Sequence, residues 1–144
     1  MKLAVLLALA ASGAVFDARR ELSVGGIRLG QSEAYVLSAL GKPESRSTSE
    51  TTDYLPVALE YPGFFIELDE QGVGRLLASS SRYCTPVGAC PGMRLSDVQR
   101  IYGSAMKVEQ IDGVPTGFVF NDGCWLAFST RAEDVLTIEI ACVP

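Results

Sequence analysis

The side chains best suited to chemistry are the carboxylates of Glu67 and Asp69. They alternate along residues 64–69, a stretch predicted to be a strand, so both point to one face of it, with Glu60 expected nearby. Two carboxylates about 5–9 Å apart can hydrolyse a glycoside, but that reaction also needs a pocket that tunes their pKa values. A small sheet offers no evident pocket of this kind. We therefore interpret these carboxylates as solvated strand residues, and a carboxylate-based hydrolase is the less favoured hypothesis.

Other catalytic and metal sites lack the residues they require. The chain contains no His, which excludes Ser-His-Asp and Cys-His sites and the usual zinc sites. There is no phosphate-binding GxxxxGK[ST] loop. The carboxylates of Glu67, Asp69 and Glu70 could bind calcium, but these residues lack the spacing of a dedicated calcium-binding loop. We predict that the protein is not an enzyme and that it has no cofactor and no metal.

The cysteines are predicted to form two disulfides. Residues 124–142 are predicted to form a hairpin, and a register that places Cys124 opposite Cys142 puts six apolar residues on one face. Directly opposed residues have Cα atoms about 4.5–5.5 Å apart, within the range of a disulfide. Cys84 and Cys90 then close a short loop. The alternatives, a redox pair or a metal site, lack the Cys-x-x-Cys spacing.

The face opposite the predicted core has the composition of a binding surface. Alternation with inward-pointing neighbours turns Phe65, Glu67 and Asp69 outward, and the hairpin register does the same for Trp125 and Glu139. Aromatic residues are enriched at binding hot spots, so these five residues are the predicted partner-binding site. The alternative is that Phe65 and Trp125 are buried where two halves of the protein meet.

The N-terminus has the layout of a secretory signal peptide over residues 1–14. Lys2 precedes a short apolar run that ends in small residues, with cleavage expected after Ala14 or, as a second choice, after Ala10. A buried N-terminal helix is the alternative interpretation. No Cys lies in the first 83 residues, so we expect no lipid anchor, and no apolar run reaches the roughly 20 residues of a transmembrane helix. The predicted location is periplasmic or secreted.

The charge of the chain argues against a nucleic-acid partner. The net charge is −5 and becomes −6 when Lys2 is removed with the signal peptide. An acidic protein suits the phosphate backbone poorly. A basic protein partner fits better, although ordinary solubility accounts for the same charge and is the preferred reading.

Two segments with the same residue spacing are predicted to be helices. In each, a glycine is followed six positions later by a valine and eleven positions later by another glycine, and the second copy starts 62 residues after the first. Ser32 is a suitable N-cap for the first helix. The motif residues are Gly30, Val36 and Gly41 in the first copy and Gly92, Val98 and Gly103 in the second. Duplication of this kind predicts a repeated structural unit.

After each helix the apolar residues alternate with a period of two, which predicts strands. The expected strands are 57–61, 64–69 and 73–80 in the first half, and 107–111, 117–120 and the hairpin 124–142 in the second. Residues 45–53 are rich in Ser and Thr and form either a loop or a polar edge strand. The predicted fold class is α+β: two tandem repeats, each one helix followed by a three- to four-stranded antiparallel sheet. The repeats span residues 15–83 and 92–144, joined by a disulfide-closed linker loop at 84–91.

The stretch from Gly30 to Pro43, GQSEAYVLSALGKP, resembles the helix signature of the small outer-membrane lipoprotein of the β-barrel assembly machine. The second copy, GMRLSDVQRIYG, resembles it more loosely. Tandem copies, export and one disulfide per half also resemble the secreted β-lactamase inhibitor proteins. The inhibitor resemblance implies paired units that present a sheet surface to an enzyme, and the lipoprotein resemblance implies a role in the cell envelope.

The leading functional hypothesis is an exported, non-enzymatic protein-binding module that inhibits or neutralises its partner. The expected partner is a secreted hydrolase or a toxin. If the partner is a toxin, the protein is an immunity protein. An accessory role in outer-membrane assembly is the alternative.

Overall fold

A computed structural model describes residues 18–50 and 54–144. The predicted signal peptide and both cleavage positions lie outside the described residues. None of the helices in the described ranges has the length and hydrophobicity needed to span a bilayer. Along the chain the elements are α1 (Ala18–Glu21), β1 (Ser23–Val24), β2 (Ile27–Arg28), α2 (Glu33–Leu40), β3 (Ser45–Thr48), β4 (Val57–Tyr61), β5 (Phe64–Asp69), β6 (Gly72–Ala78), α3 (Leu95–Tyr102), the 3₁₀ helix η1 (Gly103–Ala105), β7 (Lys107–Ile111), β8 (Val114–Asn121), β9 (Cys124–Arg131) and β10 (Asp134–Cys142).

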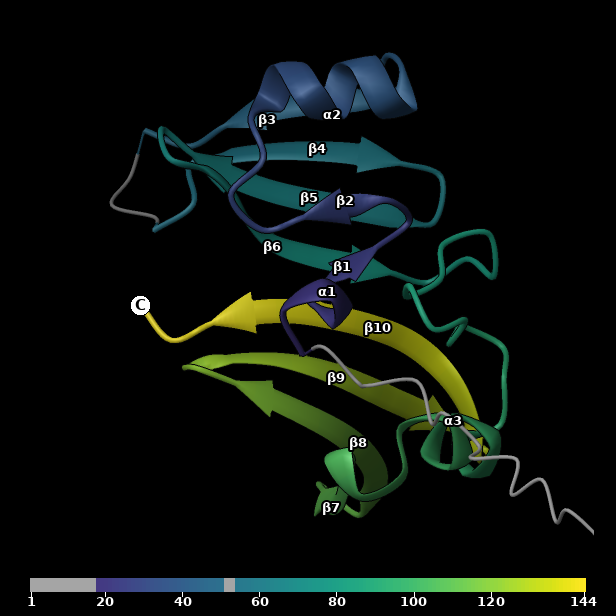
Figure 1. The fold of residues 1–144 in the computed structure, drawn as a ribbon. Helices are drawn as coiled ribbons and strands as arrows, with labels where there is room; N and C mark the ends of the chain where they lie inside the picture. Colours follow the sequence, from purple (N-terminus) through teal and green to yellow (C-terminus); the bar gives the residue numbers. More distant parts are fainter. Residues whose placement is uncertain (1–17, 51–53) are drawn as a thin grey trace, which may run out of the picture.

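One antiparallel sheet of eight strands dominates the molecule, in the order β3-β4-β5-β6-β10-β9-β8-β7 (Figure 1). The fold class predicted from the sequence, two tandem repeats each with a helix and its own three- to four-stranded sheet, is therefore wrong. The difference lies at the centre, where β6 pairs with β10 and Leu77 lies opposite Glu139. Pairing these strands satisfies backbone N–H and C=O groups that two separate sheets would leave exposed at their edges.

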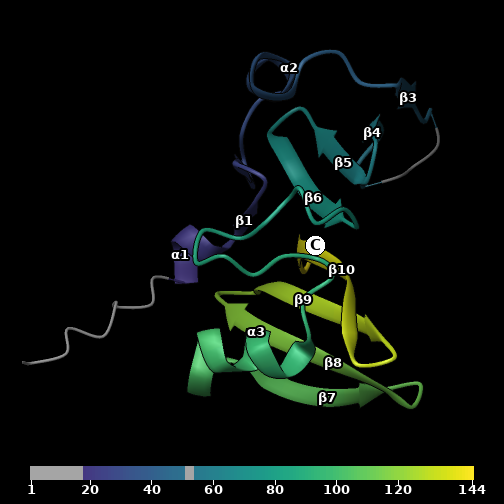
Figure 2. The same cartoon turned by 90° about the vertical axis from the view of Figure 1, so that its right-hand side faces the viewer.

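The two eight-residue helices lie on the same side of this sheet (Figure 2). Ser32 caps α2 as predicted, since its side chain accepts a hydrogen bond from the backbone N–H of Tyr35 at 3.1 Å. Each helix is preceded by a backbone segment that two hydrogen bonds fix to the sheet. Before α2, Gly30 N donates to Val73 O and Val73 N donates to Gln31 O, each at 2.8 Å. Before α3, Gly92 N donates to Val135 O and Val135 N donates to Met93 O, also at 2.8 Å.

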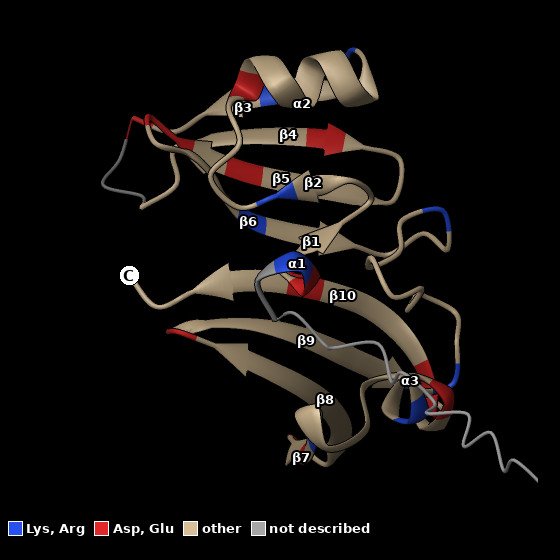
Figure 3. Cartoon of the chain, in the orientation of Figure 1, with Lys and Arg blue, Asp and Glu red and all other residues tan. Residues whose placement is uncertain are grey.

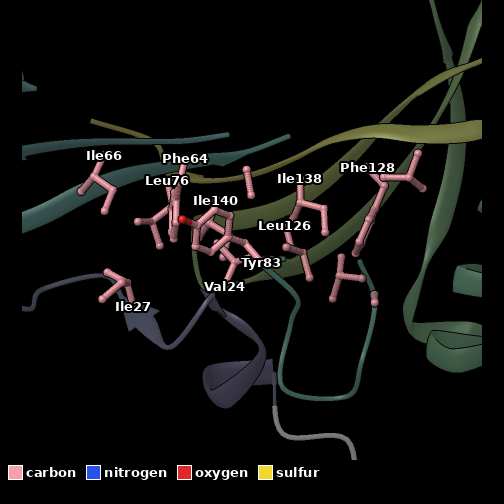
Figure 4. Packing of buried hydrophobic residues seen from close by; sticks show 14 of the residues in the cluster. Val24, Ile27, Phe64, Ile66, Leu76, Tyr83, Leu126, Phe128, Ile138 and Ile140 are labelled. Carbon is pink, nitrogen blue, oxygen red and sulfur yellow. The ribbon is translucent and has the colours of Figure 1, made fainter. Parts of the chain in front are cut away.

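The hydrophobic core lies between the sheet and the segments that cover it (Figure 4). On β5 the burial alternates, so Phe64 and Ile66 point into the core while Phe65 and Glu67 are half-buried on the other face. The covering layer contributes Val24 and Ile27 from the β1–β2 hairpin, each fully buried. One face of the sheet is thus closed by the core, and the other carries no covering helix among the described elements.

The structure forms the disulfides Cys84–Cys90 and Cys124–Cys142, the pairing that the sequence favoured. The predicted hairpin register is confirmed as well, with Cys124 opposite Cys142 and Ala127 opposite Glu139. The register follows from burial: Leu126, Phe128, Ile138 and Ile140 are all fully buried, and a shift by one residue would turn them to the open side.

Candidate functional site

The candidate site lies on the face of the sheet that none of the described helices covers, which we call the open face. Phe65 and Glu67 reach it from β5, Trp125 from β9 and Glu139 from β10. All four are half-buried rather than enclosed. The alternative that Phe65 and Trp125 are buried between two halves does not apply, because the halves meet edge to edge through β6 and β10.

An ion-pair network at the centre of the open face joins the two halves of the sheet. Arg75 on β6 pairs through Nη1 with Oε1 of Glu67, and its Nη2 donates to Oε2 of Glu139 at 2.8 Å. Nε1 of Trp125 donates to the other oxygen of Glu139 at 3.3 Å. The network therefore fixes three of the predicted site residues around a residue, Arg75, that was not predicted to belong to the site.

The electrostatics of this network favour fixed charges. Burial alone would lower the pKa of Arg75, but its hydrogen bonds to Glu139 and Glu67 outweigh burial and raise that pKa. The guanidinium stays charged and holds both carboxylates as acceptors. Arg75 is thus a positioning residue that sets the geometry of the open face.

The structure gives the carboxylates of Glu67 and Asp69 different hydrogen-bond partners. Glu67 bonds to Arg75, whereas Oδ1 of Asp69 accepts a hydrogen bond from the backbone N–H of Gln71 at 2.7 Å, in the turn that ends β5. Each carboxylate therefore has its own structural partner. Within the described residues no group of three or more His, Cys, Asp or Glu side chains could hold a metal ion.

Phe65 lies apart from the ion pairs, toward the β3 edge. It stands opposite Leu77 on β6 and Glu60 on β4, and lines a hollow of about 210 Å³. Trp125 lies on the other side of β10. The predicted aromatic residues therefore flank the ion-pair network from two sides.

Sequence reasoning missed two further aromatic residues of the open face, Phe118 and Phe120 on β8. Their rings stack with centroids 5.5 Å apart and an interplanar angle of 12°, and Phe120 is 56% exposed. Phe120 lies directly opposite Trp125. The signal was present in residues 117–120, where inward-pointing Val119 separates the two phenylalanines, and the same alternation that placed Phe65 applies there.

A buried polar cluster on the other side of the sheet is a second unpredicted feature. Glu21 is 2% exposed, and the Tyr102 hydroxyl lies 2.8 Å from its Oε2 and 2.8 Å from the Thr85 hydroxyl. Burial raises the pKa of Glu21, although hydrogen bonds from Tyr102 and Thr85 partly oppose this. Burial also raises the pKa of Tyr102, so its hydroxyl keeps its proton.

The raised pKa of Glu21 predicts a dependence of stability on pH. Because the folded-state pKa is above the unfolded value of about 4.5, the contribution of Glu21 to stability is fully present below that value and is lost as pH rises through the folded pKa. We expect Glu21→Gln to remove this fall in the free energy of unfolding. Urea unfolding between pH 4 and pH 8 measures it, with Glu70→Gln in the exposed β5–β6 turn as control. Equal pH profiles for wild type and Glu21→Gln would contradict the assignment.

Comparison with known proteins identifies similar folds but no family. No family model matches the chain, and no curated protein matches it. An extracellular protein containing an SCP domain from Bacillus anthracis str. Ames superposes with a TM-score of 0.55 at 12% identity, over 78% of this chain and 43% of that one. A cysteine-rich secretory protein from Staphylococcus aureus subsp. aureus Mu50 gives 0.51 at 10% identity, over 78% and 44%. A DUF4309 family protein from Bacillus subtilis gives 0.48 at 11% identity, over 82% and 83%.

These similarities correct the resemblance drawn from the sequence. The SCP-domain protein and the cysteine-rich secretory protein that superpose on this chain are neither β-lactamase inhibitor proteins nor the lipoprotein of β-barrel assembly. The shared motif residues are helix caps and buried positions, which many α+β folds require, so they did not distinguish these families. The chain spans less than half the length of the first two proteins, and at these identities the likeness concerns the fold alone.

Proposed function

We propose that this protein is an exported, non-enzymatic binding module that presents its open face to a partner protein and blocks that partner. One observation carries the proposal: four aromatic side chains, Phe65, Phe118, Phe120 and Trp125, lie on a sheet face that no described helix covers. Aromatic residues in such a position are typical of binding hot spots. The Arg75 ion pairs hold the face rigid, which lowers the entropy that binding costs.

Export is supported by two independent features. Both disulfides need an oxidising compartment to form and persist. Two proteins of similar fold are an extracellular protein and a secretory protein. A secreted hydrolase or a toxin active outside the cytoplasm is the partner class we propose, because a rigid binding face without a catalytic set serves to occupy another protein's surface.

The direct test compares variants of the open face with a variant on the opposite side. The oxidised full chain is immobilised, partners are captured from envelope extracts and culture medium, and the affinity of each captured protein is measured. We expect Trp125→Ala and Phe65→Ala each to weaken binding about tenfold or more, the effect of removing a hot-spot aromatic residue. Tyr35→Ala is the matched control, because Tyr35 is 46% exposed on α2, which lies on the covered side.

The same experiment also has outcomes that would contradict the proposal. If Tyr35→Ala weakens binding as much as the open-face variants do, or if both open-face variants bind as wild type does, the surface assignment is wrong. If a captured partner keeps its full activity when it is saturated with this protein, the proposed binding stands but the proposed blocking is wrong.

A further inference from the structure

The second half of the open face contains a hollow of about 220 Å³ with a mixed lining. We call it the β7–β10 hollow. Its walls combine aromatic and aliphatic side chains, hydroxyl groups and one carboxylate: Ile111, Thr116, Phe118, Trp125, Ala127, Ser129, Thr137 and Glu139. Sites for drug-sized ligands are usually about 300–1,000 Å³, so this hollow takes one ring or one side chain at a time.

Three hydroxyl groups form a row along one wall. Ser129 on β9 stands directly opposite Thr116 on β8 and Thr137 on β10, so all three side chains share the open face. Within the described residues, neither the Ser129 nor the Thr137 hydroxyl has a hydrogen-bond partner. Each can donate and accept, which suits a ligand whose groups also do both.

Two aromatic side chains and one small residue line the hollow beside the hydroxyl row. Phe118 and Trp125 lie on either side of the β8–β9 pairing, and Ala127, directly opposite both Phe118 and Glu139, fills little space between them. A ring can therefore approach the backbone of the sheet at Ala127. Its apolar face would contact Phe118 and Trp125 while its edge meets the hydroxyl row.

The hydrogen bonds already made by the one carboxylate of the hollow favour a neutral guest over a cationic one. Glu139 accepts from Arg75 on one oxygen and from Trp125 on the other, so each of its oxygens has a donor before a guest binds. Strand β8 has no charged residue, and β9 has only Arg131 at its end. Figure 3 shows these two strands almost free of charge, in contrast to β4 and β5.

We propose that the β7–β10 hollow binds one ring of a neutral carbohydrate. A pyranose has an apolar C–H face, which stacks on aromatic side chains, and an edge of hydroxyl groups that matches Ser129 and Thr137. Thr116 lies beside them; its Oγ1 donates to the Val114 carbonyl oxygen at 3.4 Å and can still accept a hydrogen bond. This binding goes beyond the protein-partner role, and it is tested without any partner protein, so either proposal can fail alone.

The chain contains a single tryptophan, Trp125, so its fluorescence reports on this hollow directly. The oxidised full chain is titrated with glucose, N-acetylglucosamine and the trimer of each, which distinguishes a glucan from an amino-sugar polymer. We expect a saturable change in Trp125 emission with at least one probe. Ser129→Ala combined with Thr137→Val is expected to weaken that binding tenfold or more, and Phe118→Ala to abolish it.

Control variants remove the same groups elsewhere on the sheet. Ser47→Ala with Thr48→Val alters the exposed strand β3 at the opposite edge and should leave the titration unchanged. Urea unfolding of each variant establishes that it is folded. Absence of saturation with every sugar would overturn the proposal, as would equal affinity in the hydroxyl variant. Saturation only by N-acetylarginine amide would also overturn it and assign the hollow to a cationic side chain.

Discussion

Gly72→Ala is expected to lower the free energy of unfolding by about 2–5 kcal/mol, because both backbone strain and a steric clash act at this position. Gly72 has φ of +111°, a conformation that residues with a Cβ rarely adopt. A Cβ there would also lie 2.6 Å from the carbonyl oxygen of Gln31 and 2.7 Å from that of Gly30. These atoms belong to the backbone segment that fixes α2 to the sheet, so it cannot yield without losing its hydrogen bonds to Val73.

A matched substitution separates the clash from the strain. Gly113 also has positive φ, +77°, but a Cβ there meets nothing within 4 Å. We expect Gly113→Ala to cost only about 1–2 kcal/mol, the usual penalty for a left-handed conformation. Urea unfolding of both variants measures the difference, and equal losses would show that the close approach of Gly30 and Gln31 contributes nothing.

Replacing Cys124 and Cys142 together by serine is expected to cost roughly 3 kcal/mol, because the disulfide restricts the unfolded chain over a separation of 18 residues. This is a large share of the roughly 5–15 kcal/mol that stabilises a typical domain. The bond also closes the end of β9 and β10 where Trp125 lies opposite Ala141. Its loss should therefore loosen Trp125 and weaken partner binding as well as stability.

The second disulfide is the natural comparison. Cys84 and Cys90 are separated by only 6 residues, so replacing both by serine should cost roughly 2 kcal/mol and leave Trp125 emission unchanged. Denaturant unfolding and fluorescence of the two double variants test this ranking. A greater loss from the Cys84–Cys90 pair would mean that the chain-entropy argument does not govern these bonds.

Local patterns predicted the strands well and their assembly poorly. The limits of β4 and β7 match the expected segments 57–61 and 107–111, because alternation and turn residues act over a few positions. The single sheet depends on the pairing of β6 with β10, which no local pattern encodes. Within the Ser- and Thr-rich segment 45–53, residues Ser45–Thr48 form the edge strand β3 because they pair with β4.

The same distinction holds for the candidate site. Alternation placed Phe65, Glu67 and Trp125 on the open face, since each has a buried neighbour in its own strand. It could not identify Arg75 as their organiser, because Arg75 reaches Glu139 only across the central pairing. The disulfide pairing could be predicted from the sequence because a hairpin fixes its own register.

The central pairing of β6 with β10 is expected to form later in folding than the other strand pairings. Every other pairing in the eight-stranded sheet joins strands that follow one another along the chain, whereas β6–β10 joins residues 75–78 to residues 138–141. Closing so long a loop is entropically costly, and such non-local contacts slow folding. We therefore expect the backbone amides shared by β6 and β10 to gain protection last in pulsed hydrogen exchange, and simultaneous protection of all strands would argue against this order. Until that step is complete, Arg75 lacks Glu139, so the open face exists only in the fully folded molecule.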